Sequence, residues 1–282
     1  MNSTCANLFF LYGPPGSGKS TIGRLLAQAL DLPFTDLDSL IETRVGKSIP
    51  DIFATEGETA FRQYERAALL EKAAGKQAVV ALGGGCLVNE QNRADAEAAG
   101  QVLFLETALE TLEERLRQDN NQRPLLRNNT DDLHTRLEGL LARRNEHYAS
   151  FATRINTNGL TPAEAVWQAQ VRLGAFRVSG MGKPYDVRIC PGGLESIGAM
   201  LTARGLKGPV ALVSDSNVAK LHGERALASL RDAGFSASLI EVPAGEEHKR
   251  LDTILHLWNA FIEAGIERSS TVVAVGGGVL SD

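Results

Sequence analysis

The chain of 282 residues is 43% hydrophobic, enough for buried cores, and at roughly 150 residues per domain its length predicts two domains. Its 29 basic and 34 acidic residues give a net charge of −5, and without a basic excess we expect no nucleic-acid partner. No apolar run approaches the ~20 residues that span a bilayer, and the N-terminus lacks the basic start and long apolar stretch of a signal peptide, so we expect a cytoplasmic protein with no membrane partner.

Short apolar runs alternate with helical stretches through the first part of the chain. The runs are residues 8–12, 78–82 and 102–106, and the first is followed by a glycine-rich turn and a helical stretch at 21–30. Wholly apolar strands that alternate with helices are typical of a parallel sheet covered on both faces. The sequence therefore predicts an α/β fold with a parallel sheet for a first domain at residues 1–175.

A second set of elements follows a helix whose start is well marked. Thr161 and Glu164 form the pattern of a capping box, with a proline at the first helical position. The glycine- and proline-containing segment 176–184 is expected to be a linker. Strand and helix patterns then resume, so residues 185–282 are predicted to be a partial Rossmann-like α/β domain. We expect it to be cut short, because it stops at Asp282, where a helix should begin.

Residues 13–20 (Gly-Pro-Pro-Gly-Ser-Gly-Lys-Ser) match G-x-x-x-x-G-K-[ST] at every fixed position, after an apolar strand and before a helix. Glycines let successive backbone N–H groups turn towards a phosphate, and the helix N-terminus adds positive potential. Lys19 is expected to reach the β- and γ-phosphates, and Ser20 to ligate Mg²⁺. A turn that only reverses the chain is the alternative, but motif and context together favour a nucleoside triphosphate site.

Asp36 and Asp38 follow a second short strand pattern. Side chains alternate with a period of two along a strand, so both carboxylates are expected to point the same way, at the strand end where ligands gather in parallel sheets. One carboxylate can hold the water shell of a metal while the other accepts a proton from a substrate hydroxyl. The alternative is that Asp38 or Ser39 caps the next helix, 39–45; the upstream phosphate loop favours the functional interpretation.

Arg62 precedes Glu65 by three residues in the helical stretch 57–74. The pair is either a surface salt bridge of little energetic value or an arginine that is oriented by the glutamate and presented to an anionic substrate. Spacing alone leaves both interpretations open.

Gly83, Gly84 and Gly85 end a buried strand and form either a tight turn or bare backbone against which a substrate lies. Arg123 lies in the polar stretch 118–130, which resembles a lid, and Arg144 lies on the next helix. Lid arginines can neutralise the charge of a transferred phosphoryl group, and a solvated basic surface is the alternative.

These motifs together resemble the shikimate kinase family over residues 5–174. The matching positions are Gly13 to Thr21, the Asp36-x-Asp38 pair, Gly46 to Ile49, Asp51 to Phe53, Glu56 to Glu58, Phe61 with Arg62, Glu65, Gly83 to Gly85, Arg123 to Leu126, and Arg144 followed by Tyr148. The resemblance implies a P-loop kinase fold for residues 1–175. It also implies ATP- and Mg²⁺-dependent phosphorylation of the shikimate 3-hydroxyl, a step of chorismate and aromatic amino acid biosynthesis.

The resemblance also implies roles for individual residues. ATP would be bound by Gly13, Gly16, Ser17, Gly18, Lys19, Ser20, Thr21 and Arg123, with Arg117 stacked on adenine. Shikimate would contact Asp38, Arg62, Gly83, Gly84, Gly85 and Arg144, and the two arginines would hold its carboxylate. Asp38 would be the base for the hydroxyl, Lys19 and Arg123 would support catalysis, and Asp36 with Ser20 would organise Mg²⁺.

Residues 183–282 resemble the N-terminal, nucleotide-binding part of 3-dehydroquinate synthase, at Val213 to Val218, Pro243 to Lys249 and Val275 to Asp282. By that likeness NAD would contact Asp215, Asn217, Glu246, Lys249, Gly277 and Gly278, and Asp282 would lie where cofactor and substrate meet. Members of that family carry their metal ligands and catalytic lysine beyond the point where this chain ends, so we expect no synthase activity from it. A Rossmann-like domain without a ligand is the alternative.

Two other functions share the phosphate loop. One is a different P-loop small-molecule kinase, acting on gluconate or a nucleotide, although no base-binding surface for a nucleotide acceptor is evident. The other is a nucleotide-binding regulatory module without turnover. A monomeric kinase domain is compatible with the sequence.

Overall fold

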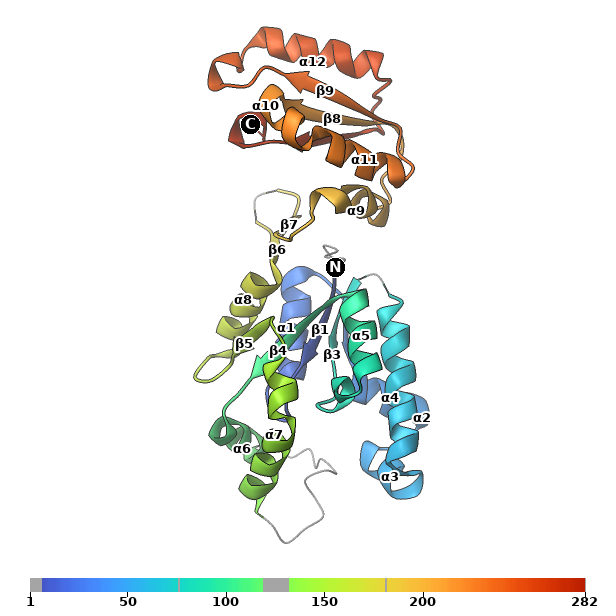
Figure 1. The fold of residues 1–282 in the computed structure, drawn as a ribbon, viewed down its shortest axis with the longest axis vertical. Helices are drawn as coiled ribbons and strands as arrows, with labels where there is room; N and C mark the ends of the chain where they lie inside the picture. The colour runs from blue at the N-terminus through green and yellow to red at the C-terminus, as the bar shows by residue number, and fades with distance from the viewer. Residues whose placement is uncertain (1–6, 76, 119–131, 181, 282) are drawn as a thin grey trace. The chain divides into compact units, whose positions relative to one another are not determined.

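The computed structural model describes residues 7–75, 77–118, 132–180 and 182–281 (Figure 1). Contacts divide the chain into two compact units, and the chain passes from the first to the second between Ile189 and Cys190. No helix in the described ranges is both long and apolar enough to cross a membrane. Both units combine a parallel sheet with helices, which confirms the predicted α/β class.

The first unit is built on a parallel sheet of five strands in the order β2-β3-β1-β4-β5. The strands are β1 (Asn7–Tyr12), β2 (Phe34–Asp36), β3 (Gln77–Ala81), β4 (Gln101–Glu106) and β5 (Arg154–Asn156). β1 lies in the centre of the sheet, and its residues from Phe9 to Tyr12 are completely buried. The three apolar runs of the sequence correspond to β1, β3 and β4.

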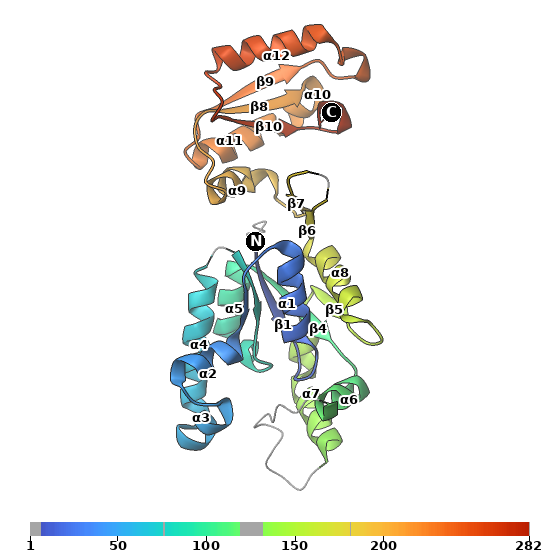
Figure 2. The ribbon, with the colours of Figure 1, turned by 180° about the vertical axis from the view of Figure 1, so that it is seen from behind.

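Helices cover both faces of this sheet (Figure 2). They are α1 (Lys19–Leu30), α2 (Leu37–Val45), α3 (Ile49–Thr55), α4 (Gly57–Ala73), η1 (Cys86–Val88), α5 (Glu90–Ala99), α6 (Leu109–Gln118), α7 (Leu133–Ala149) and α8 (Pro162–Leu173). Because alternate side chains of a strand point to opposite faces, Phe9 and Leu11 pack with α1 and α8, whereas Phe10 and Tyr12 pack with α2, α4 and α7. Two hydrophobic cores therefore flank one sheet.

The start of α8 confirms the capping box. The backbone N–H of Glu164 donates to Thr161 Oγ1 at 3.3 Å, and the backbone N–H of Thr161 donates to Glu164 Oε2 at 2.8 Å. The helix ends before Gly174, whose φ of 59° is the left-handed conformation that glycine adopts at helix C-termini.

An antiparallel hairpin follows α8. Its strands are β6 (Ala175–Val178) and β7 (Tyr185–Arg188). Nε of Arg188 donates to Asn7 Oδ1 at 2.9 Å, which ties the hairpin to β1 of the first unit. The segment 176–184, expected as a linker, begins inside β6 and ends just before β7.

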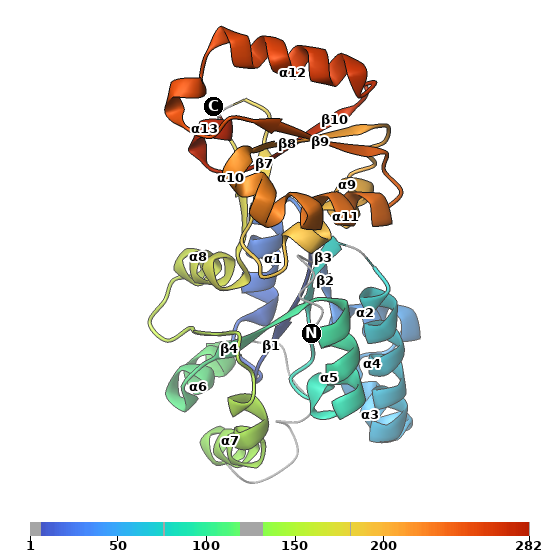
Figure 3. The same ribbon diagram turned by 45° about the horizontal axis from the view of Figure 1, so that its top comes forward.

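The second unit contains a parallel sheet of three strands in the order β10-β8-β9 (Figure 3). The strands are β8 (Val210–Asp215), β9 (Ala237–Val242) and β10 (Thr271–Val275). The helices are η3 (Leu194–Ser196), α9 (Ile197–Ala203), α10 (Ser216–Val218), the π-helix η4 (Ala219–Gly223), α11 (Glu224–Asp232), η5 (Glu246–His248), α12 (Leu251–Glu263) and α13 (Gly278–Ser281). α11 and α12 lie on opposite faces of the sheet, and Leu212 packs with Leu227 and Leu230 of α11 in the core of this unit.

Candidate active site

The loop between β1 and α1 has the conformation that the phosphate-loop motif predicts. Gly16 and Gly18 have φ of 83° and 89°, in the left-handed region that favours glycine. Lys19 is buried in the first turn of α1, and its Nζ donates to the carbonyl oxygens of Gly13 at 2.9 Å and Pro14 at 2.8 Å. The lysine ammonium is therefore held inside the loop that surrounds it.

Ser20 and Asp36 meet at the end of β2. Ser20 Oγ donates to Asp36 Oδ2 at 2.5 Å, and oxygen atoms such as these are the ligands that Mg²⁺ prefers. Among the described residues, no group of three or more His, Cys, Asp or Glu side chains lies together in a way that could hold a metal. A cation at this point would thus be held by Ser20 and Asp36 together with oxygen atoms of the nucleotide and water.

The position of Asp38 corrects the reasoning from strand alternation. β2 ends at Asp36, whose Oδ1 accepts from the backbone N–H groups of Asp38 at 3.1 Å and Ser39 at 3.4 Å, so Asp36 is the N-cap of α2. Asp38 therefore lies in the first turn of a helix and not on a strand, and the capping considered for Asp38 or Ser39 is made by Asp36. Both aspartates nevertheless line the same cavity.

The glycine turn after β3 lies in tight contact with acidic side chains and with the phosphate loop. A β-carbon placed on Gly83 would lie 2.8 Å from Glu65 Oε1 and 2.9 Å from Asp38 Oδ1. One placed on Gly84 would lie 3.2 Å from the carbonyl oxygen of Gly13. A side chain at either position would require these neighbours to shift, and the close approach brings the carboxylates of α2 and α4 next to the phosphate loop.

Arg62 is held between two carboxylates of its own helix. Its Nη1 donates to Glu65 Oε2 at 2.8 Å, and its Nε and Nη2 donate to Glu58 Oε1 at 3.2 and 3.0 Å. A guanidinium has five N–H donors, so one N–H on each terminal nitrogen is not used by these contacts among the described residues. Both terminal nitrogens lie 3.1 Å from a β-carbon placed on Gly85, so this edge of Arg62 faces the glycine turn.

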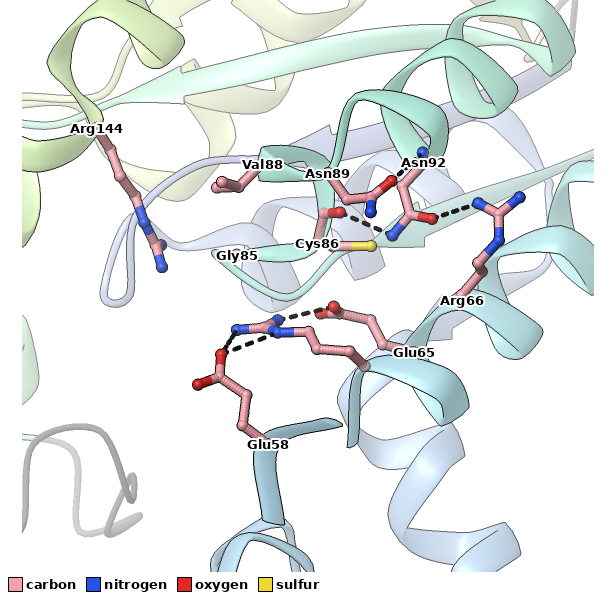
Figure 4. A pocket seen from close by; sticks show the side chains of 10 residues that line it. Glu58, Glu65, Arg66, Gly85, Cys86, Val88, Asn89, Asn92 and Arg144 are labelled. Carbon is pink, nitrogen blue, oxygen red and sulfur yellow. Dashed lines mark hydrogen bonds and ion pairs between the residues drawn. The ribbon is translucent and has the colours of Figure 1, made fainter. Parts of the chain in front are cut away.

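Arg144, on α7, reaches the same turn from another helix (Figure 4). Its Nη1 donates to the carbonyl oxygen of Gly84 at 2.7 Å, and the hydroxyls of Tyr12 and Tyr148 donate to that oxygen at 3.2 Å each. Its Nη2 lies 3.3 Å from a β-carbon placed on Gly85. Two guanidinium groups therefore converge on one glycine, an arrangement suited to a carboxylate ligand.

Glu65 differs from a surface ion-pair partner because its side chain is only 1% exposed. Burial raises the pKa of Glu65 to about 7, although the Arg62 guanidinium lowers it, and the Asp38 carboxylate adds to the increase. Burial lowers the pKa of Arg62, but Glu65 and Glu58 outweigh that effect and raise it overall, so Arg62 stays charged. Of the two interpretations of the Arg62–Glu65 spacing, the arginine oriented by the glutamate is the one observed, because the glutamate is buried.

These groups line one cavity of about 470 Å³. Its lining includes Lys19, Ser20, Asp36, Asp38, Arg62, Glu65, Gly83, Gly84, Gly85 and Arg144. A smaller cavity of about 360 Å³ shares Arg62, Glu65, Gly85 and Arg144 with it and is also lined by Arg66 (Figure 4). Side chains of the phosphate loop, the carboxylates of Asp36 and Asp38, and the Arg62–Arg144 pair thus line one cavity.

The other predicted nucleotide-site residues are spread more widely. Ser17 is buried in the phosphate loop, and Thr21 is exposed on α1. Arg117 is exposed on α6, where it pairs with Glu113 at 2.5 Å, and Arg123 lies outside the described residues.

Sequence reasoning missed Arg115, which lies two residues before Arg117 on the same helix. Its Nη2 donates to the carbonyl oxygen of Thr157 at 3.1 Å, and its Nη1 lies 3.9 Å from a β-carbon placed on Gly18. Residues two apart on a helix face different directions, but both are basic, so the pattern could not indicate which of them approaches the phosphate loop.

In the second unit, the predicted NAD-site residues follow the carboxyl ends of the three strands. Asp215 ends β8, and its Oδ1 accepts from the backbone N–H of Asn217 at 2.9 Å. Glu246 begins η5, which follows β9, and pairs with Lys249 at 3.0 Å. Ligands of parallel α/β sheets bind at this edge.

The glycines after β10 complete that edge. A β-carbon placed on Gly276 would lie 3.5 Å from Asp215 Oδ2, which brings the ends of β8 and β10 together. No atom lies within 4 Å of a β-carbon placed on Gly277 or Gly278 in the part of the chain that the structure describes. Asp282 lies outside the described residues.

Two family models match the chain. The model described as 3-dehydroquinate synthase N-terminal matches residues 239–282, and the model described as shikimate kinase matches residues 15–173, more than half of the chain. The chain belongs to the shikimate kinase family. The order of the two matches confirms the predicted arrangement of a shikimate kinase followed by an N-terminal segment of 3-dehydroquinate synthase type.

Individual relatives match either nearly the whole chain or its first part alone. A bifunctional shikimate kinase/3-dehydroquinate synthase from Thermotoga maritima is 34% identical over 276 residues, which are 97% of this chain and 50% of the relative. A shikimate kinase from Pseudomonas syringae pv. syringae is 44% identical over 164 residues, which are 58% of this chain and 94% of the relative. The chain thus spans half the length of the first relative and nearly all of the second.

Solved shikimate kinase structures agree with the fold of the first unit. A shikimate kinase from Acinetobacter baumannii in complex with shikimate has a TM-score of 0.56 at 35% identity, covering 60% of this chain and 93% of that one. A shikimate kinase from Bacteroides thetaiotaomicron has a TM-score of 0.56 at 32% identity, covering 59% and 97%. The predicted P-loop kinase fold is thereby confirmed.

Proposed function

We propose that the first unit transfers the γ-phosphoryl group of ATP to the 3-hydroxyl of shikimate. The observation that carries this proposal is the single cavity in which the phosphate loop, Asp38 and the convergent Arg62 and Arg144 meet. The similarity to an Acinetobacter baumannii shikimate kinase solved with shikimate supports the identity of the acceptor.

The acceptor would be held at its carboxylate and activated at its hydroxyl. Arg62 and Arg144 present N–H groups towards Gly85 from two helices, and such groups bind both oxygens of a carboxylate. Asp38 lies against Gly83, next to the phosphate loop, where its carboxylate would accept the hydroxyl proton. The hydroxyl oxygen then attacks the γ-phosphorus while the bond to the ADP oxygen breaks, so that shikimate 3-phosphate, ADP and one proton on Asp38 result.

The donor would be held by the phosphate loop. Lys19 would exchange its contacts with Gly13 and Pro14 for the β- and γ-phosphates, and Ser20 with Asp36 would hold Mg²⁺. Bound Mg²⁺ neutralises negative charge on the phosphates.

Two further arginines complete the proposed donor site. Arg123 would contact the ATP phosphates from the segment outside the described residues, and Arg117 would stack on adenine.

Release of ADP by the full chain tests this function. With Mg²⁺ and ATP, we expect release that depends on shikimate and not on gluconate or AMP. ATP binding without release for any acceptor would instead support a regulatory module, and release with gluconate or AMP would indicate another small-molecule kinase. Asp38→Asn should nearly abolish turnover and leave ATP binding unchanged; turnover at the wild-type rate would remove Asp38 from the role of base.

For the second unit we propose NAD binding at the carboxyl edge of its sheet. Glycines next to a strand end suit a pyrophosphate, and carboxylates suit ribose hydroxyls. Calorimetric titration of the full chain with NAD should give saturable binding that Asp215→Ala weakens. Equal binding by both forms would remove Asp215 from the proposed site.

A further inference from the structure

The glycine turn that faces the two arginines is held from behind by a buried amide (Figure 4). Asn92, on α5, is 4% exposed, and its Nδ2 donates to the carbonyl oxygen of Cys86 at 3.0 Å. The backbone N–H of Cys86 donates to the carbonyl oxygen of Gly83, also at 3.0 Å, and so closes the turn. Asn92 therefore fixes the residue at which the glycine turn ends.

Arg66 connects this amide to α4. Its Nη1 donates to Asn92 Oδ1 at 2.7 Å, and its Nη2 pairs with Asp95 at 3.1 Å. Arg66 lies one helical turn after Arg62. The helix thus contacts the turn twice, directly through Arg62 and indirectly through Arg66 and Asn92.

The turn depends on such contacts because its glycines have no side chains that could pack. The turn lies close to its neighbours. A β-carbon placed on Gly83 would lie 2.8 Å from Glu65 Oε1, and one placed on Gly85 would lie 3.1 Å from Arg62 Nη1. A shift of the turn by a few tenths of an ångström would therefore change the spacing between Arg62 and Arg144.

We propose that Asn92 and Arg66 are positioning residues for the carboxylate of the acceptor, a role that rests on the proposed function. Neither residue lines the cavity that contains Lys19 and Asp38. They act through the Cys86 carbonyl, which sets the position of Gly85 between the two guanidinium groups.

Steady-state kinetics of the full chain with Asn92→Asp test this role. The substitution keeps the shape of the side chain but turns a carboxylate oxygen towards the Cys86 carbonyl oxygen. We expect KM for shikimate to rise roughly tenfold, the effect of one lost buried hydrogen bond, while KM for ATP stays within about twofold. A purely structural role would instead lower the active fraction, and hence kcat, with no change in KM for shikimate; that result would overturn the proposal.

Arg66→Met provides a second variant in case Asn92→Asp does not fold, because the Arg66 side chain is half-exposed. Its matched control is Arg44→Met. Arg44 lies on α2, and its guanidinium pairs with Glu71 of α4, the helix that also carries Arg66, away from the turn. We expect KM for shikimate to rise with Arg66→Met and not with Arg44→Met, and equal KM values would overturn the proposal. Absence of shikimate-dependent turnover in the wild type overturns the proposed function and this role together, whereas normal wild-type turnover with unchanged KM in the variants overturns this role alone.

Discussion

Arg62 of α4 and Arg144 of α7 each bring a terminal guanidinium nitrogen to the same glycine, 3.1 and 3.3 Å from the position that a β-carbon would take on Gly85. The two side chains come from helices far apart in the sequence, and each is fixed by hydrogen bonds of its own, Arg62 to glutamates and Arg144 to the Gly84 carbonyl. Such fixed donors lose little conformational freedom when they bind a planar anion.

Replacement of either arginine by lysine should therefore weaken acceptor binding. Lysine keeps the charge but cannot make two parallel hydrogen bonds, and a hydrogen bond to a charged group is worth about 1.5–3 kcal/mol. We expect Arg62→Lys and Arg144→Lys each to raise KM for shikimate roughly 10- to 100-fold. Arg143→Lys, at an exposed neighbouring position, is the control and should leave KM unchanged; a similar KM for all three variants would argue against carboxylate binding by this pair.

The contact between Ser20 and Asp36 predicts a specific metal dependence. Ser20→Ala removes one of the two oxygen atoms that would hold Mg²⁺. If that contact contributes about as much free energy as one hydrogen bond, the Mg²⁺ concentration at half-maximal turnover should rise about tenfold. Thr43→Ala, which removes an exposed hydroxyl from α2, should leave it unchanged. Identical Mg²⁺ titrations for Ser20→Ala and the wild type would exclude Ser20 as a ligand.

A methyl group at Gly83 should impair catalysis more than folding. It would lie within 3 Å of both Glu65 Oε1 and Asp38 Oδ1, and these side-chain ends can move, so we expect kcat to fall at least about tenfold with stability changed by no more than about 1 kcal/mol. Gly139→Ala is a control inside α7, where a methyl group meets only ordinary contacts. It should stabilise the first unit by about 0.5–1 kcal/mol with kcat unchanged. Wild-type kcat in Gly83→Ala would show that the position of these carboxylates is not critical.

The raised pKa of Glu65 makes the stability of the first unit depend on pH. Burial raises its folded-state pKa from 4.5 to about 7, so between these values the folded state binds more protons than the unfolded state. Protonated Glu65 therefore contributes fully to the free energy of unfolding below about pH 4.5. This contribution, roughly 3 kcal/mol in total, is lost as the pH rises to about 7. Glu65→Gln cannot ionise and should remove this slope.

Denaturant titrations between pH 5 and 8 can measure that slope for the first unit alone. The chain has two tryptophans, Trp167 in α8 of the first unit and Trp258 in α12 of the second. In a Trp258→Phe background, the fluorescence of Trp167 therefore reports on the kinase fold. If the stability of Glu65→Gln depends on pH as strongly as that of the protein with Glu65, the group that titrates is not Glu65.

The local pattern of the sequence predicted much of the fold. The phosphate loop, the central apolar strands and the start of α8 could be derived because each depends on residues close together in the chain. The hairpin of β6 and β7 could not, because its place depends on a contact between Arg188 and Asn7 from opposite ends of the first unit.

In the candidate site, too, local features could be predicted from the sequence and long-range contacts could not. The side chain of Asp36 could be assigned to a strand end, but whether α2 begins at residue 37 or 39 depends on two backbone hydrogen bonds to that one carboxylate. Burial of Glu65 and the approach of Arg144 to Gly84 are long-range properties of the packed helices, and spacing within α4 or α7 carries no information on them.

The three donors on the Gly84 carbonyl bear on how this scaffold could be redirected towards an uncharged alcohol. Exchanging Arg144 for a neutral residue would remove the closest of those donors and leave the oxygen with the hydroxyls of Tyr12, at the end of β1, and Tyr148 of α7, which share one hydrophobic core. Two donors are enough for the two lone pairs of a carbonyl oxygen. Replacement of Arg144 therefore removes the positive charge and leaves the Gly84 carbonyl paired, so a change of acceptor preference at this position does not need a second substitution to supply a donor.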